Sequence, residues 1–329
     1  MNNTFFDKAY ELIQEATYIG VITHINTDGD AVSSALGVYN WLVKIGKKVD
    51  VCIDSIIPDN FKSLPNADEI NHKKYNKYDL VIALDAADEF RLGKYKQIIY
   101  DNKLHSLQFD HHIDANTSFC KTNVVEDISS TCELVAKFLF DVKAEIDEDV
   151  AKCLITGIFT DTGKLSYSCA SSDTFEVVSK LLKCAKTTID TILFPVYNSV
   201  SMEEFELRKY GYSKVEFFDN NQIAMICLSY EDILKTHVEL YSTKCLLDLV
   251  LPLKTVKIVA LMTEFTPNTI SCSFRTKGNI NASELAGFYG GGGHFNAAGC
   301  KIKKSILEAE KQSVLSYAMK LIRKSEEGC

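Results

Sequence analysis

The sequence predicts an α/β fold in two domains: a parallel sheet with helices on both faces, followed by a smaller α/β domain. The chain has 329 residues, roughly twice the length of an ordinary domain. Its composition, 46% hydrophobic and 24% charged, is that of a globular protein. Apolar runs alternate with helical patterns through the first half of the chain, which is typical of a parallel sheet covered on both faces.

Four apolar runs in the first half are predicted to be the strands of this sheet, because each is rich in β-branched or other apolar residues and ends in polar ones. The predicted strands are Tyr18–Thr23, Lys48–Ile53, Asp79–Leu84 and Leu104–Phe109. The helical patterns are Ala31–Val43, Thr131–Phe140, Asp147–Phe159 and Thr174–Lys183. Ligands of such sheets bind at the carboxyl ends of the strands, so we expect the functional site there.

A helical connector is predicted between the two domains. The segment Thr187–Ser213 contains Pro195 and a charged run, both typical of a solvated linker. We therefore assign residues 1–190 to the first domain, 191–215 to the linker and 216–329 to the second domain. The predicted elements of the second domain are apolar strands at Gln222–Leu228, Val256–Met262 and Thr269–Phe274, the glycine run Gly290–Gly293 and a C-terminal helix.

Charge and composition exclude several classes of protein. A net charge of −8 is unsuited to gripping long nucleic acid by electrostatics alone. The apolar stretches are too short to span a membrane, and the first residues lack the pattern of a signal peptide, so we expect a cytoplasmic protein. The 11 cysteines are scattered without C-x-x-C spacing, which predicts reduced thiols rather than a disulfide framework or a zinc ribbon.

Histidines and aspartates gather where the predicted strands of the first domain end. The cluster comprises His24, Asp28, Asp30, Asp85, Asp88, Asp110, His111, His112 and Asp161. A helix cap or an Asp-Gly turn would also explain Asp28, and a cap would explain Asp85. The adjacent pair of histidines is harder to explain structurally, and Asp161, at the C-terminal end of a helical pattern, requires a compensating cation.

Six of these side chains form a candidate site for two divalent metal ions. They are His24, Asp28, Asp30, Asp85, His111 and Asp161. Imidazole and carboxylate ligands suit hard or borderline cations. Clustered carboxylates would repel one another without positive charge, and two divalent ions would balance them and lower the pKa of a bound water.

A glycine-rich segment of the second domain is predicted to bind an anion. Gly290–Gly299 places backbone amides before a predicted helix, where they can approach a phosphate closely. Arg275, at the end of a predicted strand, could add bidentate phosphate recognition. A flexible linker and an ordinary surface arginine remain the alternatives.

Together these motifs resemble the DHH phosphoesterase superfamily. The run Asp110-His111-His112, combined with the His24-x3-Asp28-x-Asp30 pattern, is similar to the DHH domain, and the segment Gly290–Gly299 is similar to the DHH-associated C-terminal domain. The motifs spread over nearly the whole chain. Their spacing most resembles the branch of bifunctional oligoribonucleases and pAp phosphatases, often called nanoRNases.

The resemblance implies a role for each residue of the first domain. His24 and Asp28 would bind one metal, Asp30 and His111 the other, and Asp85 would bridge the two, with the remaining carboxylate completing the set. The family usually uses manganese, with magnesium or cobalt as further options.

The resemblance also implies residues that act around the metals. The catalytic set would be His112, facing the substrate, with Asp110 and Asp88 supporting the histidines. The substrate-binding set of the second domain would be Arg275, Gly291, Gly292, Gly293 and His294.

The implied activity is hydrolysis of short oligoribonucleotides or linear dinucleotides such as pApA to 5′-mononucleotides, and of pAp to AMP and phosphate. Short RNA, dinucleotides or pAp would be the partners, long duplex nucleic acid and membranes would not, and a homodimer is compatible with the resemblance. Three alternatives stay open: a cyclic dinucleotide phosphodiesterase, a manganese-dependent inorganic pyrophosphatase and a non-catalytic dinucleotide sensor. Such pyrophosphatases typically carry a basic Ser-Arg-Lys-Lys run, which this sequence lacks.

Overall fold

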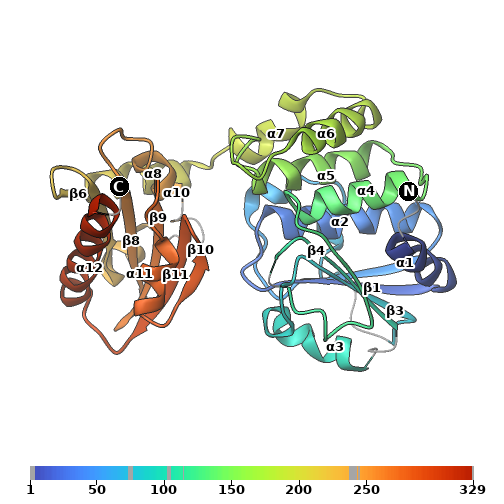
Figure 1. The fold of residues 1–329 in the computed structure, drawn as a ribbon, viewed down its shortest axis with the longest axis horizontal. Helices are drawn as coiled ribbons and strands as arrows, with labels where there is room; N and C mark the ends of the chain where they lie inside the picture. Colours follow the sequence, from blue (N-terminus) through green and yellow to red (C-terminus); the bar gives the residue numbers. More distant parts are fainter. Residues whose placement is uncertain are drawn as a thin grey trace. The chain divides into compact units, whose positions relative to one another are not determined.

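The chain forms two compact units, Met1–Ser199 and Val200–Cys329 (Figure 1). The computed structural model describes residues 4–72, 77–101, 105–113, 115–236, 243 and 245–327. The division between the units falls inside the segment predicted as the linker. Within the described ranges, no helix is both long and apolar enough to cross a membrane.

A five-stranded sheet forms the centre of the first unit, with strand order β2-β1-β3-β4-β5 and every neighbouring pair parallel. The strands are β1 (Tyr18–Thr23), β2 (Lys48–Cys52), β3 (Leu80–Leu84), β4 (Ser106–Asp110) and β5 (Thr122–Val125). The predicted parallel sheet is confirmed. The start of the fourth predicted strand, Leu104, lies outside the described residues, and the sequence analysis did not identify β5.

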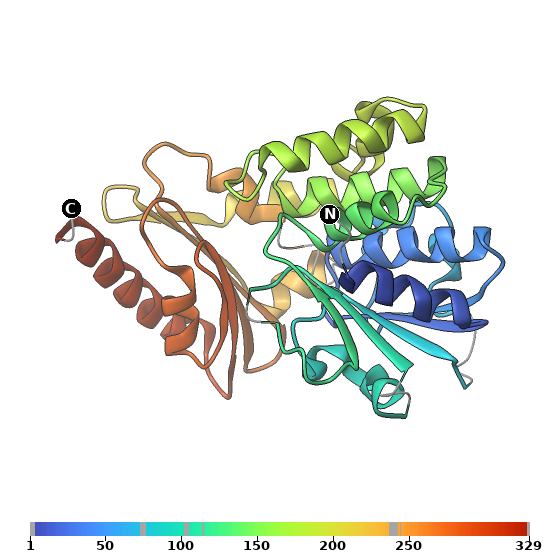
Figure 2. The ribbon, with the colours of Figure 1, turned by 45° about the vertical axis from the view of Figure 1, so that its right-hand side comes forward.

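Helices cover both faces of this sheet (Figure 2), which confirms the predicted layering. One face packs against α1 (Thr4–Glu15), α2 (Gly29–Lys44) and α4 (Thr131–Asp141). Helix α5 (Glu148–Asp161) covers α2 and α4, and α6 (Ser172–Ala185) packs on α4 and α5. The opposite face packs against η3 (Glu89–Tyr95) and α3 (Lys96–Asp101). The remaining elements of the unit are η1 (Asp59–Phe61), η2 (Ala67–Glu69) and α7 (Ile189–Tyr197), which contains Pro195.

Glycines allow α2, α4 and α5 to pack closely beside the carboxyl ends of the strands. A Cβ atom on Gly37 would lie 2.7 Å from the Leu154 side chain, so the α2 backbone rests directly on α5. A Cβ on Gly157 would lie 2.1 Å from Cys132 Sγ and 2.8 Å from Asp30 Oδ1. The absence of a side chain at Gly157 therefore makes room for the Asp30 carboxylate.

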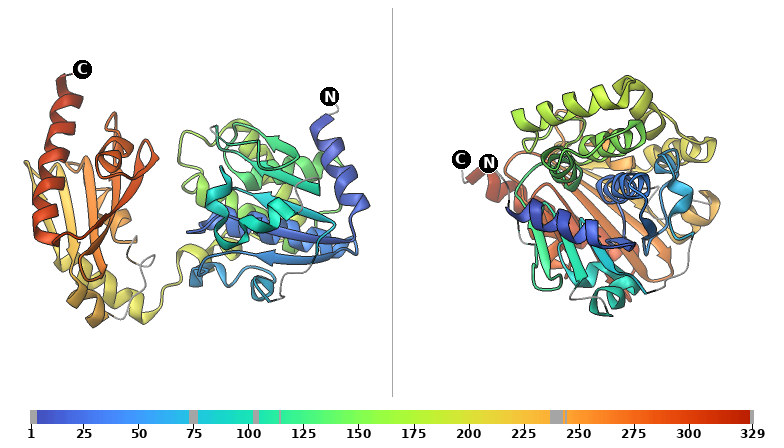
Figure 3. Two further views of the ribbon diagram at one scale, coloured as in Figure 1. Left: turned by 90° about the horizontal axis from the view of Figure 1, so that it is seen from below. Right: turned by 90° about the vertical axis from the view of Figure 1, so that its right-hand side faces the viewer.

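The second unit contains a six-stranded mixed sheet with order β10-β11-β9-β8-β7-β6, in which only β7 and β8 pair in parallel. Its strands are β6 (Val215–Phe218), β7 (Ile223–Leu228), β8 (Ile258–Thr266), β9 (Thr269–Thr276), β10 (Gly292–His294) and β11 (Ala297–Lys303). Its helices are α8 (Met202–Ser213), α9 (Tyr230–Thr236), α10 (Cys245–Val250), α11 (Ala282–Phe288) and α12 (Leu307–Glu327). Figure 3 shows α12 along one face of the sheet, and the unit is the predicted smaller α/β domain.

The sequence predicts a helix directly after the glycine run, and this prediction is wrong. The glycines instead lead into β10, which turns back into β11 as an antiparallel hairpin. A Cβ on Gly291 would lie 2.2 Å from the Gly299 carbonyl oxygen, and one on Gly293 would lie 2.6 Å from the carbonyl oxygen of Ala297. The glycines are therefore needed for the close approach of the hairpin strands, and the nearby helix, α11, precedes them.

Candidate metal centre

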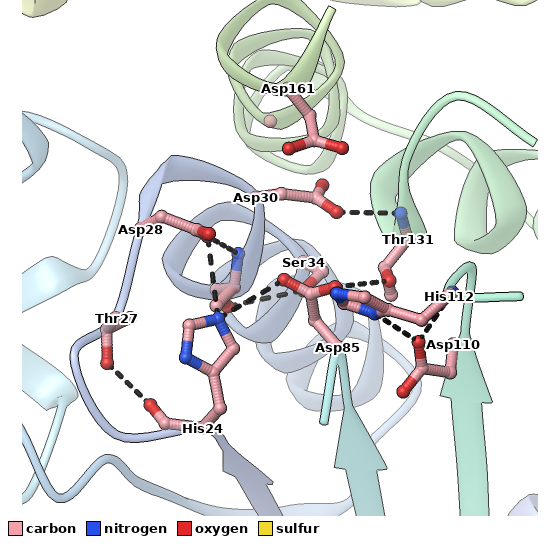
Figure 4. Close-up of polar contacts among 12 residues, drawn as sticks. His24, Thr27, Asp28, Asp30, Ser34, Asp85, Asp110, His112, Thr131 and Asp161 are labelled. Carbon is pink, nitrogen blue, oxygen red and sulfur yellow. Dashed lines mark hydrogen bonds and ion pairs between the residues drawn. The ribbon is translucent and has the colours of Figure 1, made fainter. Parts of the chain in front are cut away.

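The six predicted metal ligands lie together at the carboxyl ends of β1, β3 and β4, and Figure 4 labels all of them except His111. Two come from the loop between β1 and α2, one from the first turn of α2, one directly follows β3, one directly follows β4, and one is the last residue of α5. They are His24, Asp28, Asp30, Asp85, His111 and Asp161. Residues separated by more than a hundred positions thus meet at the edge of the sheet where a parallel α/β fold places its ligands.

His24 presents one ring nitrogen to two carboxylates. Its Nδ1 lies 2.7 Å from the Ile25 carbonyl oxygen, and because a carbonyl can only accept, the proton is on Nδ1. Its Nε2 lies 3.7 Å from Asp28 Oδ1 and 3.5 Å from Asp85 Oδ2. This Nε2 atom is buried and has no hydrogen-bond partner. Buried polar atoms are almost always paired, so an orphaned lone pair facing two carboxylates fits a cation between them.

His111 repeats this arrangement on the other side of Asp85. Its Nδ1 lies 3.2 Å from the Ile128 carbonyl oxygen, which again leaves Nε2 as the outward atom. That Nε2 lies 3.5 Å from Asp85 Oδ1 and 3.4 Å from Asp161 Oδ2. The two oxygens of Asp85 therefore face different histidines.

Asp85 itself has an unusual backbone conformation. Its φ of 56° lies in the left-handed region, which aspartate tolerates better than most residues. The Asp85 amide donates to the Phe109 carbonyl oxygen at 3.0 Å, and the Thr131 hydroxyl donates to Asp85 Oδ1 at 3.0 Å. Strained backbone of this kind is common at functional sites, where the surrounding contacts hold it in place.

The N-terminus of α4 holds Asp30. The Thr131 amide donates to Asp30 Oδ2 at 2.7 Å, and the Cys132 amide donates to Asp30 Oδ1 at 3.0 Å. Both amides belong to the positive end of the helix dipole, which favours an anion. Asp28 caps α2 by accepting from the Ala31 amide at 3.1 Å, so the capping role left open by the sequence is present alongside its position near His24.

The electrostatics of the cluster indicate a deficit of positive charge. Burial and the neighbouring Asp85 carboxylate raise the pKa of Asp30, and burial and the Asp30 carboxylate raise the pKa of Asp161. Burial lowers the pKa of His111, but nearby carboxylates outweigh it and raise the pKa. The same competition raises the pKa of His24 to about 10. Divalent cations among these side chains would supply the missing charge.

Among the residues that the structure describes, three overlapping groups of side chains could hold metal ions, with all ligand atoms of a group within 4.8 Å of one another. The groups are His24, Asp28 and Asp85; Asp30, His111 and Asp161; and Asp85, His111 and His112. Carboxylate and imidazole together suit a divalent cation of intermediate hardness. The residues present therefore fit the predicted metal centre, and Asp85 belongs to two of the groups.

His112 is oriented by a carboxylate rather than by a backbone carbonyl. Its Nδ1 lies 2.7 Å from Asp110 Oδ1, and its backbone amide donates to the same oxygen at 2.9 Å. Burial raises the pKa of Asp110, but the hydrogen bond with His112 outweighs it and lowers the pKa overall. The described contacts of Asp88 are different, because its Oδ1 accepts from the first amides of η3 at 2.7 and 3.1 Å. Asp88 is thus a helix cap, and the structure shows no contact between it and the histidines among the described residues.

Sequence reasoning missed Thr131, which contacts two of the predicted ligands. A local signal for this helix start was present. Ser130 accepts from the Glu133 amide at 3.0 Å as the cap of α4, and serine followed three residues later by glutamate is a common start of a helix. That signal would have located the helix end, although not the carboxylate that binds there.

In the second unit, the predicted substrate-binding residues lie on β9 and on or directly before β10, the two strands that flank β11. His294 pairs with Ala297, and Ala297 pairs with Arg275, so the three positions are aligned across β10, β11 and β9. The half-buried Arg275 donates from Nη1 to the Phe274 carbonyl oxygen at 3.1 Å. Gly292 and Gly293 belong to β10, while the side chain of His294 lies outside what the structure describes.

Comparison with known proteins gives concordant matches along the chain. Residues 18–158 match the DHH family, N-terminal domain, and residues 242–324 match the DHHA1 domain. The bifunctional oligoribonuclease and PAP phosphatase NrnA of Mycoplasma genitalium is 27% identical over 317 residues, 93% of this chain and 96% of the relative. The probable bifunctional oligoribonuclease and PAP phosphatase NrnA of Streptococcus mutans is 25% identical over 300 residues, 91% of this chain and 93% of the relative.

A solved structure shares both units of the fold. It is an exopolyphosphatase-related protein from Bacteroides fragilis, 27% identical, with a TM-score of 0.88 and 97% of each chain covered. Fold and site thus define a two-domain α/β protein with a histidine and aspartate centre suited to divalent metals. The chain joins a DHH domain to a DHHA1 domain, as the motifs predicted.

Proposed function

We propose that this protein is a metal-dependent phosphoesterase that hydrolyses short oligoribonucleotides and linear dinucleotides such as pApA to 5′-mononucleotides, and pAp to AMP and phosphate. The observation that carries the proposal is the convergence of His24 and His111 on opposite oxygens of Asp85. Relatives of 25% and 27% identity, matched over more than nine-tenths of their length, bear names that describe this pair of activities.

The metal ligands of the proposed enzyme fall into two sets around Asp85. His24 and Asp28 would hold one ion, and Asp30, His111 and Asp161 would hold the other. When bound, two divalent cations supply positive charge to phosphoryl oxygens and lower the pKa of a coordinated water. Manganese is the proposed ion because mixed imidazole and carboxylate ligands suit it.

His112 is the proposed residue for stabilising charge on the substrate. The buried Asp110 carboxylate fixes the Nδ1 proton of His112 and holds the ring in one orientation. A donor held in place before the reaction can stabilise the negative charge that develops on a phosphoryl oxygen. Asp110 therefore acts through His112, and we assign Asp88 no role beyond the cap that it forms.

The second domain is proposed to hold the far end of a short substrate. Arg275 would pair with a terminal phosphate, and Gly292, where a Cβ would meet nothing within 4 Å, would let a ligand approach the backbone of β10 closely. His294 is retained from the family resemblance. We further propose that the enzyme acts in the cytoplasm, and a homodimer stays a prediction of the resemblance alone.

A product assay by chromatography tests this function. Purified protein with manganese is given pApA, a five-nucleotide RNA, pAp, cyclic di-AMP and pyrophosphate in parallel, each with an EDTA control. Mononucleotides from both RNAs and AMP from pAp, all abolished by EDTA, are expected. Phosphate from pyrophosphate alone, or cleavage of cyclic di-AMP alone, would overturn the substrate assignment. Nucleotide binding without cleavage of any substrate would favour a sensor.

A further inference from the structure

The turn that follows Asp161 has an unusual backbone. The three successive residues Gly163, Lys164 and Leu165 have φ values of 55°, 61° and 62°. Left-handed conformations are unfavourable for residues with side chains, so the surrounding contacts must hold this turn. The turn reverses the chain, so that Ser166 and Tyr167 lie next to the end of α5.

Hydrogen bonds to Thr162 fix this turn. The amides of Ser166 and Tyr167 both donate to the Thr162 carbonyl oxygen at 3.0 Å, and the Leu165 amide donates to the Thr162 hydroxyl at 3.1 Å. The Thr162 hydroxyl in turn donates to the Ile158 carbonyl oxygen of α5 at 2.6 Å. The turn is therefore anchored to the helix that carries Asp161.

The ring of Tyr167 folds back over Gly163. A Cβ atom on Gly163 would lie 2.4, 2.4 and 2.7 Å from Cε1, Cζ and Cε2 of Tyr167. An atom close to these three carbons, with the hydroxyl oxygen farther away, stands above the face of the ring rather than at its edge. The glycine backbone thus covers one face of the ring, while the side chain as a whole is 62% exposed.

The turn that carries this ring directly follows a ligand of the candidate metal centre, since the Tyr167 amide donates to the carbonyl oxygen of Thr162, the residue after Asp161. Gly163 is two residues from Asp161, which limits their Cα atoms to a separation of about 7 Å. The Asp161 carboxylate lies 3.4 Å from His111 Nε2. An aromatic face supported from behind and open to solvent is therefore placed within a few residues of the metal ligands.

We propose that Tyr167 is a substrate-binding residue that stacks on the nucleobase of the nucleotide whose phosphate is held at the metal centre. The proposal rests on the proposed function and adds how the base is held. Every base has an aromatic face, so stacking binds all four bases with little sequence preference. A glycine-backed ring also loses little freedom on binding, because the turn already fixes it.

A structural role is the competing explanation, in which the ring only shields Gly163. A kinetic comparison separates the two explanations. Tyr167→Leu removes the aromatic face, and Tyr167→Phe keeps it. Tyr100→Leu is the matched control, because Tyr100 is an exposed tyrosine of α3. Tyr100 lines a cavity with Asp79 and Leu80, at the amino end of β3 and so at the opposite end of the strand from Asp85. The substrates are pApA and two versions of it that each lack one base.

With pApA, Tyr167→Leu should raise KM about tenfold, the size expected for one lost stacking contact, with kcat within about twofold. Tyr167→Phe and Tyr100→Leu should match the wild type. One of the two abasic substrates lacks the base that Tyr167 stacks on. With that substrate, the KM of Tyr167→Leu should equal that of the wild type, because no base is present to stack. An equal rise in KM on all substrates, or loss of bound manganese, would show a structural role and overturn the proposal.

A binding measurement tests the stacking without any turnover. Trp41, the one tryptophan of the chain, is 2% exposed and gives a constant background of fluorescence. In Tyr167→Trp, AMP should quench the fluorescence of the new tryptophan, whereas ribose 5-phosphate should not. The same titration after metal removal with EDTA, and again after manganese is added back, tests whether the quenching depends on the metal. Equal effects of the two ligands, or none from AMP, would overturn the proposal.

The two experiments keep the proposals distinguishable. If the wild type cleaves no RNA but AMP quenches Tyr167→Trp, the proposed function fails and base stacking stands. If the wild type cleaves pApA while Tyr167→Leu retains the wild-type KM, base stacking fails and the proposed function stands.

Discussion

The three histidines of the candidate centre are oriented by two different kinds of partner. His24 and His111 each direct Nδ1 to a backbone carbonyl, an arrangement that presents Nε2 as a lone pair towards carboxylates. His112 instead directs Nδ1 to the buried carboxylate of Asp110, which holds the ring in place from the side of the protein. An imidazole held through Nδ1 by a backbone carbonyl is a typical metal ligand. The hydrogen-bond partner of Nδ1 thus separates the two roles among otherwise identical side chains.

His112→Ala should abolish most of the turnover while leaving the metal content near normal. Loss of one charge-stabilising donor commonly lowers kcat by about 100-fold or more. Turnover of pApA and manganese content by elemental analysis are the two measurements, and His105→Ala, directly before β4, is the control. Loss of manganese in proportion to activity would instead make His112 a metal ligand.

Sequence motifs predicted which residues would gather at the centre, but not how each would be oriented. The orientation of His24 depends on the carbonyl of its neighbour Ile25, which is set by the backbone and not by a residue type. The anchoring of Asp30 depends on Thr131, which is 101 positions away and reaches it only after α2 and α4 have packed together. Such contacts depend on tertiary packing, so a local sequence pattern does not predict them.

At the scale of elements, continuous apolar strands were the easiest to predict, and the glycine-rich strands of the second unit were the hardest. The range Tyr18–Thr23 matches β1 at both ends, because a continuous buried run has clear limits. The hairpin of β10 and β11 was mistaken for a loop and helix, since glycines carry no period by which a strand is recognised. The sequence analysis did not identify α1, although Phe6, Ala9 and Ile13 are buried on one side of it at helical spacing.

The start of α9 in the second unit is predicted to lose stability in acid. The Asp232 carboxylate accepts from the Tyr210 hydroxyl and from the Ser229 amide at 2.9 Å, and it lies 3.4 Å from Lys214 Nζ. Burial raises the pKa of Asp232, but these partners outweigh it and hold the pKa below its ordinary value. A carboxyl group with a lowered pKa stabilises the fold above its ordinary pKa, and the contribution disappears as the pH falls through the lowered value.

Asp232→Asn should therefore lower the free energy of unfolding at pH 7, and the difference from the wild type should shrink below about pH 4. Urea unfolding over this pH range provides the measurement, with Asp219→Asn in the turn between β6 and β7 as the control. A difference that stays constant, or grows as the pH falls, would contradict the assignment.

At the scale of the whole molecule, all six candidate metal ligands belong to the first unit. Each unit also has hydrophobic clusters made only of its own residues. A ligand that binds the folded state of one unit stabilises that unit by mass action. Metal binding and the stability of the second unit should therefore be separable.

Manganese at about 100 times its dissociation constant should raise the melting temperature of the first unit by about 5–10 °C and leave that of the second unit nearly unchanged. Differential scanning calorimetry with manganese and with EDTA gives the measurement, and Asp85→Asn should abolish the shift. An equal shift of both transitions would show that the metal is not confined to the first unit.

The glycine at position 157 has a further consequence for how the chain tolerates change. The space beside it is filled by Cys132 and by the carboxylate of Asp30, so even alanine there would displace one or the other. In a scan of all single substitutions, changes at Gly157 would reduce activity as strongly as changes at a catalytic residue, although glycine has no side chain that could take part in the reaction. A map of the positions that tolerate no substitution would thus include the contact between α2, α4 and α5 as well as the catalytic residues. Only a second measurement, such as metal content, would separate the packing positions from the catalytic ones.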